Sequence, residues 1–381
     1  MDFTYDDEQV ALRDAVRGLV GAAYADFESR RKAVAGDPGF DESLWSRMAD
    51  MGLLGLPFAE EDGGVGAGPV EIGIVCRELG RVVAPEPYLA SVVLAGGLVA
   101  ACGSQEQRAE MLGALSAGDS VLAFAHDEPG RRWGPTAAAV TAAASDDGAS
   151  WTLTGVKEPV PHGARADVLV VSAALPDGGT GLFLVSGDDA DRTGYAAYDG
   201  SRVARIGLDG TAATPLGTAG LDVTASIATV QDIARVMAAN QALGSMQTAL
   251  AMTTDYLKSR KQFGVTLNTF QALTFRAADM YVSQELAVSM VDWATMVVAQ
   301  GDPDALADAA SRVALQVSRV GRHIGQEAIQ LHGGIGMTAE YAVGAHLAQL
   351  TMLDHLFGDG GFQLGRLAST VTEHGALDPL T

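Results

Sequence analysis

The last third of the chain constrains the fold most, because its pattern is that of three long helices joined by short breaks. Residues 227–260, 270–300 and 304–331 are each about 30 residues long, carry apolar stripes at helical spacing and contain few helix-breaking residues. Long helices bury such stripes most readily against one another, as in an antiparallel bundle. We therefore predict a C-terminal domain over residues 226–381 that is a long four-helix bundle.

The two preceding regions differ from the bundle and from each other. Residues 4–117 carry helical patterns broken by glycine and proline, and they predict an all-α N-terminal domain over residues 1–118. Residues 120–225 hold short β-prone runs separated by Asp-Gly, Gly-Gly and proline-containing turns, and they predict an antiparallel sheet or barrel over residues 119–225. The runs are too close together for crossover helices. The fold class is thus α+β, with helical, β and helical domains in that order.

Composition argues against several classes of function. A net charge of −22 repels nucleic acid and anionic membranes, so we expect neither as a partner. Cys76 and Cys102 are too few for a disulfide framework, and the seven histidines lack metal-ligand spacing beside carboxylates, so we predict no metal. The acidic start lacks the basic and apolar segments of a secretory signal, and no apolar run is long enough to cross a membrane. We expect a cytoplasmic protein.

The first informative motif begins where the first long helix is predicted to end. It is a charged, amide-bearing and aromatic cluster composed of Arg260, Lys261, Gln262, Phe263 and Gly264, followed by Phe270 and Gln271. An arginine can bind a pyrophosphate through two parallel hydrogen bonds, and an aromatic ring can stack on a flat ligand. The alternative is a purely structural role, in which the basic residues offset the helix dipole and Phe263 packs against its neighbours.

The second motif is a glycine-rich turn after the third long helix. Its sequence is Gln330-Leu331-His332-Gly333-Gly334-Ile335-Gly336. Three glycines in four residues let a backbone approach a ligand closely or adopt positive φ. The same residues are also compatible with a plain helix terminus, and they fit neither the Walker A nor the Rossmann fingerprint. We interpret His332 as a packing or backbone-binding residue rather than an acid.

Taken together, the two motifs resemble the C-terminal domain of acyl-CoA dehydrogenases. The resemblance extends over Tyr256-Leu257, Arg260, Gln262-Phe263-Gly264, Phe270-Gln271-Ala272, Ala278-Asp279-Met280, Gln330 to Gly336 and Thr338. The opening Asp2-Phe3-Thr4 with Glu8-Gln9 is similar to the start of that family. The family's order of helical, β and helical domains covers essentially the whole chain.

This resemblance implies FAD as the cofactor, in a pocket built from two subunits. In such enzymes the arginine that matches Arg260 binds the FAD pyrophosphate of a neighbouring subunit, and the glycine-rich segment lies against the FAD nucleotide from across the dimer. The implied cofactor-binding residues are Arg260, Gln262, Phe263, Phe270, Gln271, Gln330, Leu331, His332, Gly333 and Gly334. An oligomer is then part of the pocket, and we expect a homotetramer or an α2β2 heterotetramer with a paralogous subunit.

The resemblance also implies α,β-desaturation of an acyl-CoA thioester, in which a carboxylate removes the α-proton and FAD accepts a hydride from the β-carbon. Many members supply a glutamate as the base; counting back from Arg366-Leu367, its position falls on Asp359. Aspartate is one methylene shorter, and a structural helix-cap role for Asp359 is the alternative. Other members place the glutamate early in the first bundle helix, where this chain has Ala234, with Asp232 two residues earlier.

The β-region departs from the family pattern in two turns. A Thr-Glu-Pro-Gly-x-Gly-Ser-Asp-like turn, which lines flavin and substrate in the family, is here the segment from Asp127 to Trp133, with only Glu128-Pro129-Gly130 retained. A Trp-Ile-Thr-like segment over the flavin is replaced by Pro159-Val160-Pro161, and Pro161 has neither a hydroxyl nor an amide hydrogen to donate. Such departures resemble actinobacterial-type α2β2 members that act in steroid side-chain breakdown.

Three functions therefore stay open. The first is that the chain is an FAD-dependent acyl-CoA dehydrogenase. We then expect its acyl-CoA substrate to be bulky or steroid-like and its electron acceptor to be an electron-transfer flavoprotein. Alternatively, it is a non-catalytic subunit that completes the FAD pocket of a heteromeric acyl-CoA dehydrogenase. A third alternative is a flavin oxidase or monooxygenase on the same fold, which would produce hydrogen peroxide or consume oxygen.

Overall fold

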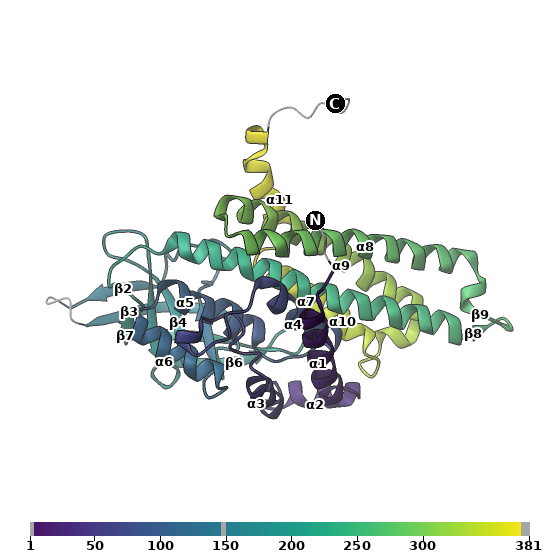
Figure 1. Ribbon diagram of the computed structural model, residues 1–381, viewed down its shortest axis with the longest axis horizontal. Helices are drawn as coiled ribbons and strands as arrows, with labels where there is room; N and C mark the ends of the chain where they lie inside the picture. The colour runs from purple at the N-terminus through teal and green to yellow at the C-terminus, as the bar shows by residue number, and fades with distance from the viewer. Residues whose placement is uncertain (1–3, 146–149, 375–381) are drawn as a thin grey trace.

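The computed structural model describes residues 4–145 and 150–374, and its elements form three successive parts (Figure 1). The first part is helical. Its elements are α1 (Asp7–Ala23), α2 (Phe27–Ala35), α3 (Glu42–Asp50), η1 (Glu60–Asp62), α4 (Pro69–Arg81), the π-helix η2 (Tyr88–Gly96), α5 (Gly97–Cys102) and α6 (Gln105–Ser116). Side-chain caps fix several of its starts, since Asp6 and Ser104 form capping boxes with Gln9 and Gln107.

The last part is a bundle of long helices. Its elements are α7 (Thr224–Ser259), β8 (Lys261–Gln262), β9 (Val265–Thr266), η4 (Leu267–Thr269), α8 (Gln271–Gln300), α9 (Pro303–His332), η5 (Gly333–Met337), α10 (Val343–Leu356), α11 (Gly360–Ser369) and η6 (Val371–His374). The three predicted long segments correspond to α7, α8 and α9, and α10 packs against α7 and α9 as the fourth helix. Figure 1 shows α11 projecting from the body of the bundle. The predicted α+β fold with helical, β and helical parts is confirmed.

The first and last parts share one hydrophobic core, and α4 lies directly on α7. Two glycines permit this approach. A Cβ atom at Gly80 would lie 1.9 Å from the carbonyl oxygen of Gln241, and one at Gly244 would lie 1.8 Å from that of Arg77. Any side chain at either glycine would push the two helices apart, so the N-terminal helices and the bundle form one rigid support.

The middle part is a seven-stranded sheet. Its elements are β1 (Leu122–Ala125), β2 (Thr141–Ala144), β3 (Trp151–Pro161), β4 (Val168–Ala174), β5 (Thr180–Ser186), η3 (Gly187–Asp189), β6 (Asp191–Ala196) and β7 (Arg202–Pro215). Most neighbouring strands are antiparallel, as predicted, but β1 pairs with β4 in parallel. All four β1 residues are buried, which is typical of a parallel strand covered on both faces. A parallel contact also joins β2 to β4 at Thr141 and Ala174. The prediction of an antiparallel sheet was wrong for these pairs, because β-prone runs and turns carry no information on which strands pair or in which direction.

A buried ion pair holds the middle of this sheet domain. The ammonium of Lys157, on β3, is fully buried and lies 2.9 Å from the Glu128 carboxylate. Burial lowers the pKa of Lys157 to about 8, while ion pairing opposes that shift. Burial would raise the pKa of Glu128, but hydrogen bonds from the amides of Val140 and Ala139 and from Lys157 hold it at about 2. Both groups are therefore charged at neutral pH, and each depends on the other.

Replacing Lys157 by Met should destabilise the chain strongly, because it leaves the Glu128 carboxylate buried without its cation. We expect the free energy of unfolding in urea to fall by about 3–5 kcal/mol. As a matched control, Arg312→Met breaks the exposed Arg312–Asp308 pair and should cost under about 1 kcal/mol. Equal losses in the two variants would contradict the importance of the buried pair.

Candidate active site

A cavity of about 240 Å³ lies where the sheet domain meets the helices. Elements distant in sequence line it: Phe124 and Asp127 from β1 and the turn that follows, Pro159 and Pro161 from β3, and Gln231 from α7. On the other side, Leu356 and Phe357 come from the end of α10. The structure thus brings together the two turns in which the sequence departs from the family pattern. An apolar cavity with a few convergent polar groups is a common form of ligand site.

Asp127 is the carboxylate that lines this cavity. Burial raises the pKa of Asp127 from 3.8 to about 6, against a hydrogen bond from the Trp133 amide and the charges of Arg132 and Lys157. The Trp133 amide donates to Oδ1 of Asp127 over 3.3 Å. A carboxyl group with this pKa changes its charge near neutral pH, unlike an exposed aspartate. Sequence analysis placed Asp127 in the flavin-lining turn but did not single it out.

Trp133 joins the same turn to the end of the bundle. Its indole nitrogen donates to the carbonyl oxygen of His355 over 2.9 Å, and its ring centroid lies 5.6 Å from that of Phe362. The backbone of Trp133 has φ of 71°, a conformation that is uncommon outside glycine. The turn is therefore held against α10 and α11 beside the cavity, and only its unusual Trp at a position of small polar residues signalled this in the sequence.

Asp359, the candidate base, is the N-cap of α11. Its carboxylate accepts a hydrogen bond from the backbone amide of Phe362 over 2.9 Å, which fixes the first turn of the helix. Gly358 precedes it with φ of 108°. The structure thus realises the helix-cap role that the sequence offered as an alternative. Asp359 does not line the cavity described above, although its near neighbours Leu356 and Phe357 do.

Asp232 and two arginines anchor the segment before Asp359. Asp232 is buried and accepts from Arg235 and Arg366, and Arg235 also donates through Nε to the carbonyl oxygen of Phe357 over 2.7 Å. Burial lowers the pKa of Arg235, and the Asp232 charge opposes this. Both carboxylate oxygens of Asp232 accept hydrogen bonds from these arginines, so Asp232 does not stand in for the missing helix glutamate at Ala234.

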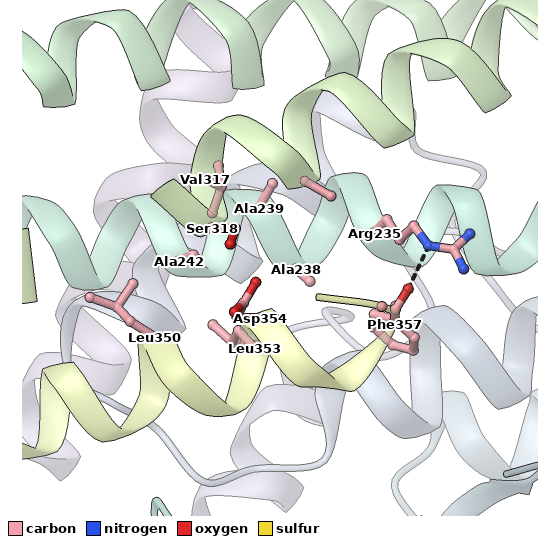
Figure 2. A pocket seen from close by; sticks show the side chains of 12 residues that line it. Arg235, Ala238, Ala239, Ala242, Val317, Ser318, Leu350, Leu353, Asp354 and Phe357 are labelled. Carbon is pink, nitrogen blue, oxygen red and sulfur yellow. Dashed lines mark hydrogen bonds between the residues drawn. The ribbon is translucent and has the colours of Figure 1, made fainter. Parts of the chain in front are cut away.

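Figure 2 shows a second, much smaller hole inside the bundle, with Arg235 among the residues that line it. It has a volume of about 30 Å³ and is lined by small residues of α7, among them Ala238, Ala239 and Ala242. Asp354 of α10 and Ser318 of α9 point into it (Figure 2). A space of this size holds about one water molecule between polar groups and is too small for an acyl group.

The Arg260 motif forms an exposed hairpin at the end of α7. Strands β8 and β9 pair around Phe263, which is 93% exposed, and the centroids of the Phe263 and Phe270 rings lie 6.2 Å apart. Arg260, Gln262 and Gln271 are exposed as well. Within residues 4–145 and 150–374, the Arg260 side chain makes no hydrogen bond or ion pair. The Phe263 ring thus lies beside the Phe270 ring but is otherwise exposed, so packing against its neighbours, as in the purely structural interpretation, accounts for little of its surface.

The glycine-rich motif lies at the same end of the bundle. The buried His332 ring sits between Tyr256 of α7 and Tyr341, with centroid separations of 4.6 and 5.0 Å. Its Nδ1 lies 2.7 Å from the Ala328 carbonyl oxygen, and burial lowers the pKa of His332. These contacts agree with the packing role predicted for His332. Leu331 is also buried, whereas Gln330, Gly333 and Gly334 are exposed, and Gly333 has φ of 64°.

Comparison with known proteins agrees with this architecture. Residues 6–119 match the N-terminal domain of acyl-CoA dehydrogenases, and residues 224–372 match the C-terminal domain. The acyl-CoA dehydrogenase FadE27 of Mycobacterium tuberculosis is 30% identical, over 98% of this chain and 99% of the relative. The chain belongs to the acyl-CoA dehydrogenase family. It is thus a member of an oxidoreductase family of flavoproteins.

Other acyl-CoA dehydrogenases are similarly close. The human mitochondrial short-chain specific enzyme is 30% identical over 81% of this chain and 77% of its own length. Among solved structures, the Tcur3481–Tcur3483 steroid ACAD has a TM-score of 0.86 at 30% identity, covering 97% of this chain and 98% of that one. The ChsE4–ChsE5 complex from Mycobacterium tuberculosis has a TM-score of 0.88 at 28% identity, covering 99% of this chain and 100% of that one.

Two further observations concern the acyl-CoA dehydrogenase chain as a whole. In the part that the structure describes, no helix has both the length and the apolar character needed to cross a membrane. Over the same residues, no group of three or more His, Cys, Asp or Glu side chains is arranged to hold a metal ion.

The raised pKa of Asp127 predicts how stability changes with pH. Folded Asp127 keeps its proton up to about pH 6, whereas the unfolded chain releases it near the ordinary 3.8, so the stabilisation is complete at low pH and is lost as the pH rises through about 6. Asp127→Asn should therefore raise the unfolding free energy by up to about 2–3 kcal/mol at about pH 8 and have little effect near pH 4. Urea unfolding of both proteins from about pH 4 to about pH 8 measures this difference in unfolding free energy. An Asp188→Asn control, at a side chain that is 96% exposed, should change nothing, and a pH-independent effect of Asp127→Asn would contradict the assignment.

Proposed function

We propose that this chain takes part in FAD-dependent α,β-desaturation of an acyl-CoA thioester. The observation that carries the proposal is the cavity between the sheet domain and the bundle, because the segments at Asp127 and Pro159 meet the end of α10 there. These are the segments that, by family resemblance, face the flavin and the acyl group. The redox chemistry is that of FAD when bound, and the chain's own part is to orient the reactants and to move a proton.

The residues present fit FAD at the far end of the bundle. The cofactor-binding set proposed for a neighbouring subunit's FAD comprises Arg260, Gln262, Phe263, Phe270 and Gln271, with Gln330, Leu331, His332, Gly333 and Gly334 from the glycine-rich turn. Support comes from the exposed Arg260 guanidinium, which has no partner in the described part of the chain, and from the exposed glycine backbone. A guanidinium matches two phosphate oxygens in a plane. Such a site requires an oligomer, either a homotetramer or an α2β2 assembly with a paralogous subunit.

We expect Arg260→Gln to weaken FAD binding by the assembly about 10- to 100-fold, because it removes one charge-assisted contact to phosphate. The FAD affinity of Arg260→Lys should lie between those of the original chain and Arg260→Gln, since lysine keeps the charge and loses the paired hydrogen bonds. Titration of the purified assembly with FAD, followed by flavin fluorescence, gives the dissociation constants. Arg312→Gln, at an exposed arginine of α9, is the control. Unchanged affinity in Arg260→Gln would exclude the proposed role.

Asp359 is the proposed base that removes the α-proton. Asp359 follows the cavity-lining Phe357 by two residues, and its carboxylate caps α11, so it would have to release the Phe362 amide to reach a substrate. Gly358, Gly360 and Gly361 flank it and lower the barrier to such a rearrangement. An aspartate that must move and is one methylene short makes a weaker base than the family's glutamate.

Flavin bleaching by acyl-CoA tests Asp359 directly. Asp359→Asn should abolish bleaching while leaving stability nearly unchanged, because asparagine also caps helices well. Asp359→Glu should bleach at least as fast as the original chain, since it restores the missing methylene. Asp302→Asn, at the N-cap of α9, is the matched control and should bleach normally. Bleaching that survives in Asp359→Asn would exclude this residue as the base.

A second candidate is a subunit that completes a partner's FAD pocket and turns over no substrate itself. Three features favour it: Pro159 and Pro161 at the cavity, the Trp133 link to His355 beside it, and the engagement of Asp359 as a cap. The chain expressed alone and incubated with FAD distinguishes the two. A flavin spectrum near one FAD per chain supports the dehydrogenase, and an empty spectrum restored by co-expression with a paralogous subunit supports the second candidate.

The acyl group that we propose is bulky and steroid-like, and the acceptor is an electron-transfer flavoprotein. Support for the former is the likeness to the steroid ACAD Tcur3481–Tcur3483 over nearly the whole chain. A flavin oxidase or monooxygenase would instead reoxidise rapidly in air, with hydrogen peroxide or an oxygenated product. Slow reoxidation by oxygen and fast reoxidation by the flavoprotein are the expected results.

A further inference from the structure

We propose that Asp127 makes occupation of the cavity by a flavin ring proton-linked, so that the chain binds oxidised FAD with uptake of one proton at this carboxyl. The inference rests on the proposed function in taking FAD as the ligand. The inference goes beyond the proposed function because it makes Asp127 the residue that sets the pH range over which the cavity binds its cofactor.

The walls of the cavity fit a flat ring with one polar edge. Phe124, Pro159, Pro161 and Leu356 provide apolar surface, and the prolines have no amide hydrogen to donate. The polar groups that line the cavity are Asp127, Gln231 and Arg132, together with His126, Tyr195 and His355. Asp127 is the carboxyl group among them, and it replaces the threonine hydroxyl that the family motif carries at this position.

The charged and titratable groups around Asp127 do not neutralise it fully. Arg132 and Lys157 favour its ionised form, Glu128 opposes it, and Lys157 is already paired with Glu128. The other titratable groups at the cavity are His126, His355 and Tyr195. Burial lowers the pKa of His126 to about 4, so this ring is neutral above about pH 5 and offers no compensating positive charge.

The edge of an oxidised isoalloxazine ring selects between the two forms of Asp127. The edge carries several acceptors, two carbonyl oxygens and the neighbouring ring nitrogens, and a single N–H donor. A neutral carboxyl can donate to one acceptor, whereas an ionised carboxylate only accepts. A bound ring also displaces water from Asp127, and removal of water disfavours the charged form further. Both effects favour the protonated residue, so binding takes up a proton wherever free Asp127 is ionised.

The test is the dissociation constant of FAD for the full chain from about pH 5 to about pH 8.5, measured by quenching of flavin fluorescence. Linkage to one proton predicts that affinity falls by up to tenfold per pH unit above the point at which free Asp127 ionises. Asp127→Asn and Asp127→Thr should bind FAD with a flat profile, at least as tightly as the original chain does at low pH. Asp188→Asn, at an exposed aspartate of the same domain, should keep the original slope.

Three results would overturn the proposal. They are an FAD affinity of the original chain that does not change with pH, the same pH dependence in Asp127→Asn as in the original chain, or no FAD binding by either of these two proteins at any pH. Calorimetry in two buffers of different ionisation enthalpy provides a second readout, because it counts the proton taken up directly. These measurements need no turnover. A proton-linked FAD site whose flavin acyl-CoA does not bleach would refute the proposed desaturation and leave the role of Asp127 standing. Bleaching by acyl-CoA together with an FAD affinity that does not depend on pH would support the desaturation and refute the role of Asp127.

Discussion

The buried pair of Glu128 and Lys157 is the constraint on which the candidate site depends. Glu128 accepts backbone amides of the chain that leads into β2, and Lys157 donates to Glu128, Ser172 and the carbonyl oxygen of His126. The pair therefore ties the turn after β1 to β3 inside the sheet domain. Asp127 lies next to Glu128, and Pro159 lies two residues after Lys157, so one interaction positions both the turn at Asp127 and the cavity-lining end of β3. The pair gives Glu128 a structural role that does not depend on the residues around it, which differ from the family pattern.

A different set of ion pairs and hydrogen bonds holds the opposite wall of the cavity. Asp232, Arg235 and the partly exposed Arg366 form a charge cluster that fixes the carbonyl oxygen of Phe357 and the last turn of α11 against α7. Breaking such a cluster leaves an unpaired buried charge, which is costly. The helix α7 is in turn held against α4 by the close contact at Gly80 and Gly244. The wall beside Asp359 is thus rigid, and the only simple movement open to Asp359 is release of its cap.

The sequence was sufficient for the features that repeat or that have a local cause. The long helices follow from apolar periodicity. The end of α8 follows from Gly301, and the start of α9 follows from Asp302 and Pro303. The parallel pairing of β1 with β4 and the link from Trp133 to His355 depend on contacts between distant segments, which no local pattern encodes. Asp359 illustrates the limit: one residue has the spacing of a base and the geometry of a cap, and its neighbours in sequence favour neither.

The distribution of arginines explains how so acidic a chain could hold a dinucleotide. The buried Arg235 and the partly exposed Arg366 share Asp232, and the partly buried Arg77 is paired with Asp292, because a charge removed from water needs a partner. Arg260 escapes this requirement since water solvates it at the exposed hairpin. If a neighbouring subunit covers that hairpin, the guanidinium loses its water and needs an anion, and a pyrophosphate meets that need. On the proposed function, cofactor binding and assembly then stabilise each other by the same free energy, whichever comes first.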